Sequence, residues 1–179
     1  MNGGSVGQAG VPTTGSLDIL NGGFVRGLNV NVAPRGDATG TISVDGIGST
    51  LITFGTGTGE NRINLGQDFD ATGGGEGTMT VRDGGFVSMA VLVVGHSSAA
   101  GDLLTVTDPG SVLRVSNDEG FAFGDSEEGG FLRAAHNDGS EGEIRILNGG
   151  QIFVTSGSSQ IFVTSGSSQI FGPGLPDRA

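Results

Sequence analysis

Acidic side chains that alternate with other residues ahead of a glycine turn are the first candidates for chemistry. Asp68 and Asp70 stand two residues apart before Gly73, and Glu76 follows them. Carboxylate oxygens at such positions are ligands that Ca²⁺ prefers, so this segment predicts a calcium site formed by Asp68, Asp70 and Glu76. A complete EF-hand loop would need Glu at its twelfth position, where this chain has Met79. The alternative interpretation is a solvated acidic loop that keeps the protein soluble.

A second short motif is the tripeptide Arg35-Gly36-Asp37, which follows Pro34 in turn-rich sequence. Arg-Gly-Asp in a turn between strands is typical of integrin-binding loops. The motif therefore predicts a receptor-binding site at Arg35, Gly36 and Asp37. Because short motifs also arise by chance, an ordinary surface turn is the alternative.

Residues suited to catalysis are few. The chain has no Cys and only two His, which excludes disulfides, thiolate metal sites and a thiol nucleophile. A pair of carboxylates can cleave glycosidic bonds, but the chain lacks the Trp and Tyr on which sugar rings usually stack. We therefore expect no enzyme, no catalytic residue and no cofactor other than calcium. A carbohydrate-binding or carbohydrate-processing β-helix is the alternative.

The composition narrows the class of protein further. Of 179 residues, 37 are Gly, and the formal net charge is −11. A strongly acidic chain without basic clusters is a poor partner for nucleic acid. No apolar run approaches the length needed to span a bilayer. Residues 1–14 lack the basic start and the apolar stretch of a secretory signal peptide, so we expect no export signal in this chain.

Short strands must position these residues, because apolar and polar residues alternate in short runs that end at glycine turns. One kind of turn contains Asn-Gly-Gly or Asp-Gly-Gly, and the other contains Gly-Ser. The interval from Ile19 to Val81 equals the interval from Val44 to Val106, and Ile146 follows Val81 at a slightly longer interval. A two-part unit of strands and turns is therefore repeated along the chain.

A fixed repeat of this kind predicts an all-β fold, a parallel β-helix or solenoid. Stacked coils would bury one apolar face, so we expect the five anchor positions to point into one core at equivalent places. Five anchors predict five coils, two of them with long excursions, whereas coils of about 20 residues would give about seven. An antiparallel β-sandwich, which also uses many short strands, is the alternative.

The order of the motifs resembles the autotransporter-associated β-helix repeats of bacterial surface and secreted proteins. The resemblance rests on a Gly-Thr-x-x-Val strand, an Asn-Gly-Gly turn, a Val-Val-Gly strand end and a Gly-x-Gly-Ser-x-Leu segment. These lie at 77–81, 21–23, 93–95 and 46–51. It covers about residues 15–152 and implies a right-handed parallel β-helix that serves as a stalk or an adhesive surface.

The C-terminal part of the chain differs from the rest. Residues 151–159 recur identically at 160–168, and their first three residues return at 169–171. Uncharged, β-prone strands invite pairing with another chain, although the segment could equally close the solenoid as one more coil. The predicted assembly residues are Gln151, Ile152, Phe153, Val154, Gln160, Ile161, Phe162 and Val163.

These features divide the chain into an N-terminal segment (1–14), the β-helix repeats (15–152), and the duplicated strands with a tail (153–179). They predict a non-enzymatic structural module, a stalk or fibre subunit, outside a bacterial cell or on its surface. We expect end-to-end association with copies of itself, with a host or matrix surface as a further candidate partner. We expect neither a nucleic-acid partner nor a membrane span.

Overall fold

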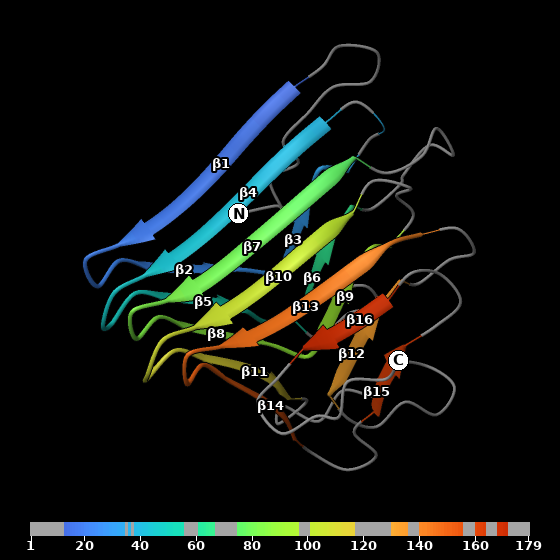
Figure 1. The fold of residues 1–179 in the computed structure, drawn as a ribbon. Coiled ribbons are helices and arrows are strands. Elements are labelled where there is room, and N and C mark those ends of the chain that lie inside the picture. The colour runs from blue at the N-terminus through green and yellow to red at the C-terminus, as the bar shows by residue number, and fades with distance from the viewer. Residues whose placement is uncertain are drawn as a thin grey trace.

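The structure is a computed structural model that describes residues 13–34, 36, 38–55, 61–66, 75–96, 101–116, 130–135 and 140–155, and the strands at 160–163 and 168–171. Every regular element in these ranges is a β-strand, and the strands form three sheets (Figure 1). Sheet 1 contains β1 (Thr13–Leu20), β4 (Ala38–Asp45), β7 (Glu76–Arg82), β10 (Asp102–Thr107), β13 (Gly142–Leu147) and β16 (Ser168–Phe171). Sheet 2 contains β2 (Phe24–Gly27), β5 (Thr50–Thr53), β8 (Phe86–Met89), β11 (Val112–Ser116) and β14 (Gln151–Thr155). Sheet 3 contains β3 (Asn29–Val32), β6 (Arg62–Leu65), β9 (Val91–Val94), β12 (Phe131–Ala134) and β15 (Gln160–Val163).

Successive strands enter sheets 1, 2 and 3 in turn, and each strand pairs with the strand three places along the chain. All of these pairings are parallel. The chain is therefore a parallel β-helix with three sides, as the repeat predicted. The antiparallel sandwich is excluded, because a sandwich would pair neighbouring strands in opposite directions.

Each set of three consecutive strands makes one coil, so coil 1 is β1–β3 and coil 5 is β13–β15, while β16 begins a sixth. Residues paired in register on successive strands of a sheet form a column. The column that starts at Ile19 continues through Val44, Val81, Val106 and Ile146. The number of residues from one member of this column to the next is short and equal for the first and third intervals and larger for the second and fourth. A short coil and a long coil together therefore make the repeated unit. The described residues therefore form five complete coils and the first strand of a sixth, which agrees with one coil for each of the five anchors and not with about seven coils.

Glycine turns join sheet 1 to sheet 2, and two kinds alternate as the sequence indicated. In coils 1, 3 and 5 both central residues have positive φ, for example 54° at Asn21 and 79° at Gly22. A backbone hydrogen bond of 2.8–3.0 Å closes each of these turns. In coils 2 and 4 the turn holds positive φ at Gly48 and Gly110, just before a buried Ser. Asn, Asp and Gly tolerate this backbone region best, so these residue types specify where each coil bends.

The core lies inside the helix, where the inward side chains of all three sheets meet. Ile19, Val44, Val81 and Val106 are at most 3% exposed, which confirms four of the five anchors. Ile146, in the last complete coil, is half-buried. Sheet 3 is buried on its outer side as well in coils 3 and 4, where Val91, Val93 and Phe131 form a second apolar cluster with Ala90. This accounts for the uninterrupted apolar sequence of β9.

The duplicated nine-residue segment builds three sides of the helix in turn. The first copy contains β14 in sheet 2, the second contains β15 in sheet 3, and the three residues that begin a third copy form most of β16 in sheet 1. Each strand pairs in parallel with the strand of the preceding coil, respectively β11, β12 and β13. The segment therefore extends the solenoid, and its three strands form the last edges of the three sheets.

Candidate functional site

The predicted calcium residues are described only in part. Asp68 and Asp70 lie outside the described residues. Glu76 is exposed at the first position of β7. Within the part of the chain that the structure describes, no group of three or more His, Cys, Asp or Glu residues is placed to hold a metal ion. The calcium site stays a prediction.

The Arg-Gly-Asp motif lies between β3 and β4. Gly36 is exposed in a turn, and Arg35 and Asp37 lie outside the described residues. Receptor binding through this motif also stays a prediction.

The predicted assembly residues lie at the C-terminal end of the helix. In β14, Gln151 and Phe153 point outward and are exposed, whereas Ile152 and Val154 point inward and are half-buried. Residues 160–163 form β15, whose side chains lie outside the description. Strands β14, β15 and β16 are the last of their sheets, and none of the other described strands pairs with their outer edges. These residues therefore stand at three strand edges.

Both ends of the helix leave the core partly open. Several inward residues that are fully buried in coils 2–4 have half-buried counterparts in coils 1 and 5, in the same columns. For example, Leu51, Val87 and Leu113 are 0% exposed, whereas Val25 and Ile152 in their column are only partly buried. The half-buried residues packed on the core are Leu17, Val25, Val30, Ile152 and Val154. At each end, apolar side chains of the core are therefore partly exposed to solvent.

Exposed large apolar side chains gather at the same two ends. Leu20 and Phe24 lie in coil 1 with exposures of 47% and 62%, and Leu147 and Phe153 lie in coil 5 with exposures of 40% and 45%. Leu20 and Leu147 belong to one column, whose intermediate members are Asp45, Arg82 and Thr107. The fifth such residue among those described, Ile47, lies in the turn of coil 2. Apolar surface placed in this way is typical of an interaction site.

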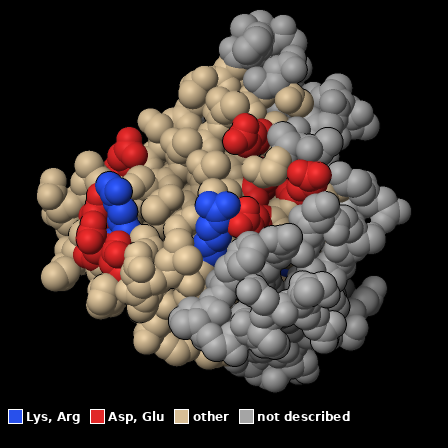
Figure 2. Space-filling view, in the orientation of Figure 1, with Lys and Arg blue, Asp and Glu red and all other residues tan. Residues whose placement is uncertain are grey.

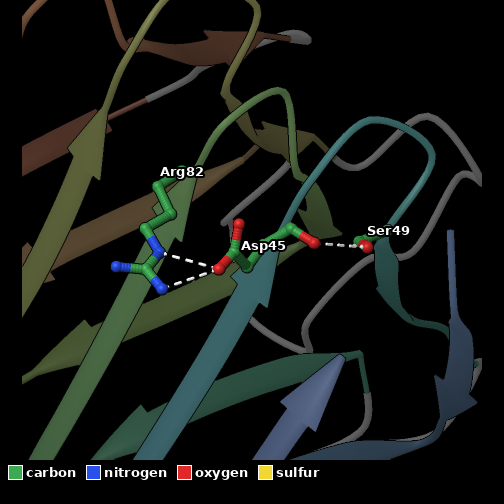
Figure 3. A network of polar contacts seen from close by, with 3 residues as sticks. All are labelled: Asp45, Ser49 and Arg82. Carbon is green, nitrogen blue, oxygen red and sulfur yellow. Dashed lines mark hydrogen bonds and ion pairs between the residues drawn. The ribbon is translucent and has the colours of Figure 1, made fainter. Parts of the chain in front are cut away.

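Polar contacts connect the turns of neighbouring coils. The hydroxyl of Ser49 donates to the Asp45 carbonyl oxygen at 2.7 Å (Figure 3). The same hydroxyl accepts from the Gly22 N–H in coil 1 at 3.1 Å. Two coils further on, the hydroxyl of Ser111 accepts from the Gly84 N–H at 3.0 Å. Each Gly-Ser turn therefore satisfies a backbone donor of the Asn-Gly or Asp-Gly turn in the coil before it. This pairing is the physical reason why the two kinds of turn alternate.

Asp45 also forms an ion pair with Arg82 on the next strand of sheet 1. Its Oδ2 accepts from Arg82 Nε at 2.9 Å and from Arg82 Nη2 at 2.7 Å (Figure 3). The hydrogen bond that Arg82 donates to Asp45, and then the negative charge of Asp45, raise the pKa of the Arg82 guanidinium. Because Arg82 is exposed, we expect the ion pair to add little to the free energy of unfolding.

Asp102 is the one fully buried acid among the described residues. Its Oδ1 accepts a hydrogen bond of 2.5 Å from the Gly77 N–H, and its Oδ2 has no hydrogen-bond partner among the described residues. Burial raises the pKa of the Asp102 carboxyl to about 8, and the charge of Glu76 adds to the effect. The group is therefore neutral at pH 7. It faces Gly66 and Gly77 inside the helix, which suits a structural role.

The outer face of sheet 1 carries its charges in two groups (Figure 2). Threonine and serine residues occupy about half of the outward positions from β1 to β13, and Thr39 donates a 3.3 Å hydrogen bond to Thr14 in the neighbouring coil. One charged group lies where the strands end, with Asp45 and Arg82, and the other lies toward the strand starts, with Glu143 and Arg145. Arg145 Nε contacts Glu143 at 2.6 Å within the same strand.

The outer face of sheet 2 differs in chemistry from the rest of this acidic chain. Its five strands contain no Asp or Glu. One outward column contains Phe24 and Phe86, and the other contains Arg26, Arg114 and Phe153. The guanidinium of Arg26 lies 3.9 Å from the ring centre of Phe54. The face combines aromatic rings with cations, which is a chemistry suited to binding sugars or anions.

No family model, curated protein or solved structure matches the chain. The β-solenoid that the resemblance to autotransporter-associated repeats implied is present, and the family assignment itself belongs to the proposal below. None of the described residues forms a helix long and apolar enough to cross a membrane.

Proposed function

We propose that this chain is a non-enzymatic structural module, a rigid segment of a stalk or a fibre subunit. The observation that carries the proposal is the core, whose columns continue from coil 1 to coil 5 with one cross-section and remain open at both ends. In a solenoid each coil contacts only its neighbours, so length can be added without any change in the local packing. A protein built in this way is suited to span a distance.

We further propose a location outside the cell or on its surface, which the resemblance to autotransporter-associated repeats supports. Antibodies raised against the purified chain would test this in the organism that produces it. Immunogold labelling of intact cells should place the protein on the surface or on projecting fibres, and external protease should remove the label. Labelling that appears only after the cells are opened would contradict the proposed location.

A rigid rod also makes a mechanical prediction that does not depend on location. Coils joined by parallel ladders and by turn-to-turn hydrogen bonds should detach one at a time when the ends are pulled. Force spectroscopy on the tethered chain should therefore show successive extensions, each corresponding to the length of chain in one coil, with short and long steps that match the short and long coils. Extension of the whole chain at a low force in a single event would contradict a load-bearing role.

Carbohydrate binding is the second candidate, and the acid-free outer face of sheet 2 favours it. Phe24 and Phe86 are two coils apart in one column, so their rings are about 10 Å apart along the helix. Sugar rings could stack on them, and Arg26 would favour an acidic polysaccharide. Affinity electrophoresis against a uronate polysaccharide and a neutral glucan tests the idea. Retardation by the uronate that Phe24→Ala and Arg26→Ala abolish would support it, and equal mobility in all gels would contradict it.

A further inference from the structure

The two ends of the helix differ by one strand. Sheet 1 has six strands, whereas sheets 2 and 3 have five each, because β16 alone represents a sixth coil. At the other end, β1, β2 and β3 are the first of the described strands in the three sheets, and all three belong to coil 1. At the C-terminal end, the edges of β14 and β15 therefore lie one coil lower than the edge of β16. Without β16, the two ends would present the same set of three edges.

The strand that makes this step is short. β16 pairs with β13 through four residues, from Gly142 with Ser168 to Arg145 with Phe171. β1 is eight residues long and pairs with β4 along its whole length. β13 has six residues, so its last two, Ile146 and Leu147, have no partner in β16. A strand with the length of β1 could pair with all of β13.

The side chains at the two ends also match. If β1 of a second copy paired with β13 in the register of the other coils, its Leu20 would follow Leu147 in their common column. The half-buried Leu17, Val25 and Val30 of that copy would continue the core columns of the first. Surfaces that are exposed or half-buried in one copy would thus be covered by the other, which is the driving force for association.

From these observations we propose that copies of this chain stack head to tail, and that β1 of one copy replaces β16 on the edge of β13 in the next. The second copy's β2 then lies on β14, and its β3 lies on β15. Strand addition of this kind gains a full set of backbone hydrogen bonds. The inference rests on the proposed structural role and names its partner, a second copy. It also predicts a role for β16. While β16 is paired with β13, the edge of β13 is covered and a second copy cannot bind there, so β16 limits assembly.

A contact between two different ends does not close on itself. Such head-to-tail contacts generate a filament rather than a dimer, and the filament axis coincides with the axis of the helix. Within the filament, the spacing between coils would continue across each junction at about 4.8 Å. Fibre diffraction of aligned filaments should show this spacing along the fibre axis.

The first test weakens β16 in the full chain. Proline has no backbone N–H and disfavours a strand, so Ile170→Pro should release β16 from β13, whereas Ile170→Val should retain it. We expect Ile170→Pro to lower the concentration at which half of the protein is assembled by about tenfold or more, as followed by sedimentation velocity and electron microscopy. The Val variant should behave like the parent chain. Parent and Ile170→Pro chains that both stay monomeric at the highest soluble concentration would overturn the proposal.

The second test copies an ion pair from the outer face of sheet 1 to the junction between two copies, in the Ile170→Pro background. Leu147→Asp and Leu20→Arg would recreate between two copies the Asp45–Arg82 pair of coils 2 and 3. Either change alone should weaken assembly by about tenfold, because it places one unpaired charge against Leu. The double variant should recover assembly and become sensitive to salt. Assembly that neither single change affects would place the contact elsewhere and overturn the proposal.

The outcomes also separate this inference from the structural role itself. Both leucines are exposed in the single chain, so thermal melts of the variants should match the parent and exclude misfolding as the cause. A monomer that still extends coil by coil in force spectroscopy would overturn head-to-tail stacking and leave the structural role standing. Filaments with the predicted junction, formed by a chain that extends in a single low-force event, would support head-to-tail stacking and contradict the structural role.

Discussion

Asp102 occupies a position where neighbouring coils have glycine. Its column in sheet 1 contains Gly40, Gly77 and Gly142. A Cβ atom at Gly40 would lie 2.5 Å from Val32 Cγ1, because the end of the preceding strand passes close by. In coil 4 the Asp102 carboxyl instead fills the space beside Gly66, where even a methyl group would collide with Oδ2. Asp102 therefore fits in the core because Gly66 has no side chain to occupy the same space.

The raised pKa of Asp102 predicts a pH dependence of stability with a definite sign. The pKa is about 8 in the folded chain because of burial, and the ordinary value is 3.8. Below pH 4 both states are protonated, and the group costs nothing. As the pH rises from about 4 to about 8, the unfolded chain loses its proton while the folded chain keeps it, so stability falls. The loss is on the order of 6 kcal/mol at most.

Asp102→Asn should remove this loss, because the amide keeps an oxygen for the Gly77 N–H and has no charge to suppress. We expect the variant to unfold at a higher temperature than the parent chain at pH 8 and at nearly the same temperature at pH 4. Thermal melts across this range measure the difference. Asp18→Asn, which removes an exposed acid on β1, is the matched control and should show no such trend. A pH-independent difference between Asp102→Asn and the parent would contradict the assignment.

At the scale of the elements, the Gly-Ser turns hold pairs of coils together. Ser49 and Ser111 are fully buried, and each accepts a backbone N–H from the turn of the coil before it. The hydroxyl therefore acts between coils, whereas the glycines act within one turn. Pairs of coils, rather than single coils, are the unit that the sequence repeats.

Ser49→Ala should leave the Gly22 N–H without its acceptor. Loss of this partly buried hydrogen bond costs about 0.5–1.5 kcal/mol in free energy of unfolding, and urea unfolding would measure it. Ser88→Ala, at an outward position of β8, is the control and should change stability by less than about 0.5 kcal/mol. Equal effects of the two substitutions would show that the bond between coils adds nothing.

At the scale of the whole molecule, the alternation of coils predicts that one two-coil unit can be removed. Val44 and Val106 occupy the same column, two coils apart. Deleting residues 45–106 joins Val44 to Thr107, so every later strand keeps its inward and outward faces. We expect a folded β-protein with a lower melting temperature, because fewer interfaces between coils remain. Circular dichroism and thermal melts would follow both properties.

A deletion shorter by one residue provides the control. Removing residues 45–105 shifts the following strand by one position and turns its apolar residues to the solvent. This variant should aggregate or remain unfolded. If both deletions fold equally well, the register of the columns does not determine the fold.

Local chemistry in the sequence was sufficient to predict the strands, the turns and the core. Alternating apolar residues around Val44, Val81 and Val106 specify which face is buried, and Asn-Gly or Gly-Ser pairs specify where the chain bends. Both signals act over a few residues, so they can be recognised without knowing which strand lies next to which. The equal intervals between equivalent anchors then indicated that the bends belong to stacked coils.

The tertiary structure alone decided what depends on residues a whole coil away. The burial of Asp102 in β10 depends on Gly66, which follows β6, and the role of Ser49 depends on Gly22. One nine-residue sequence enters three different sheets, although its copies are identical, because each strand takes the next free edge of the preceding coil. The sequence marked the duplicated segment as an edge, but only the stacking revealed that the two ends differ by a single strand. Such features arise from pairing between coils, and the energy of that pairing is determined by the neighbouring coil rather than by the local sequence.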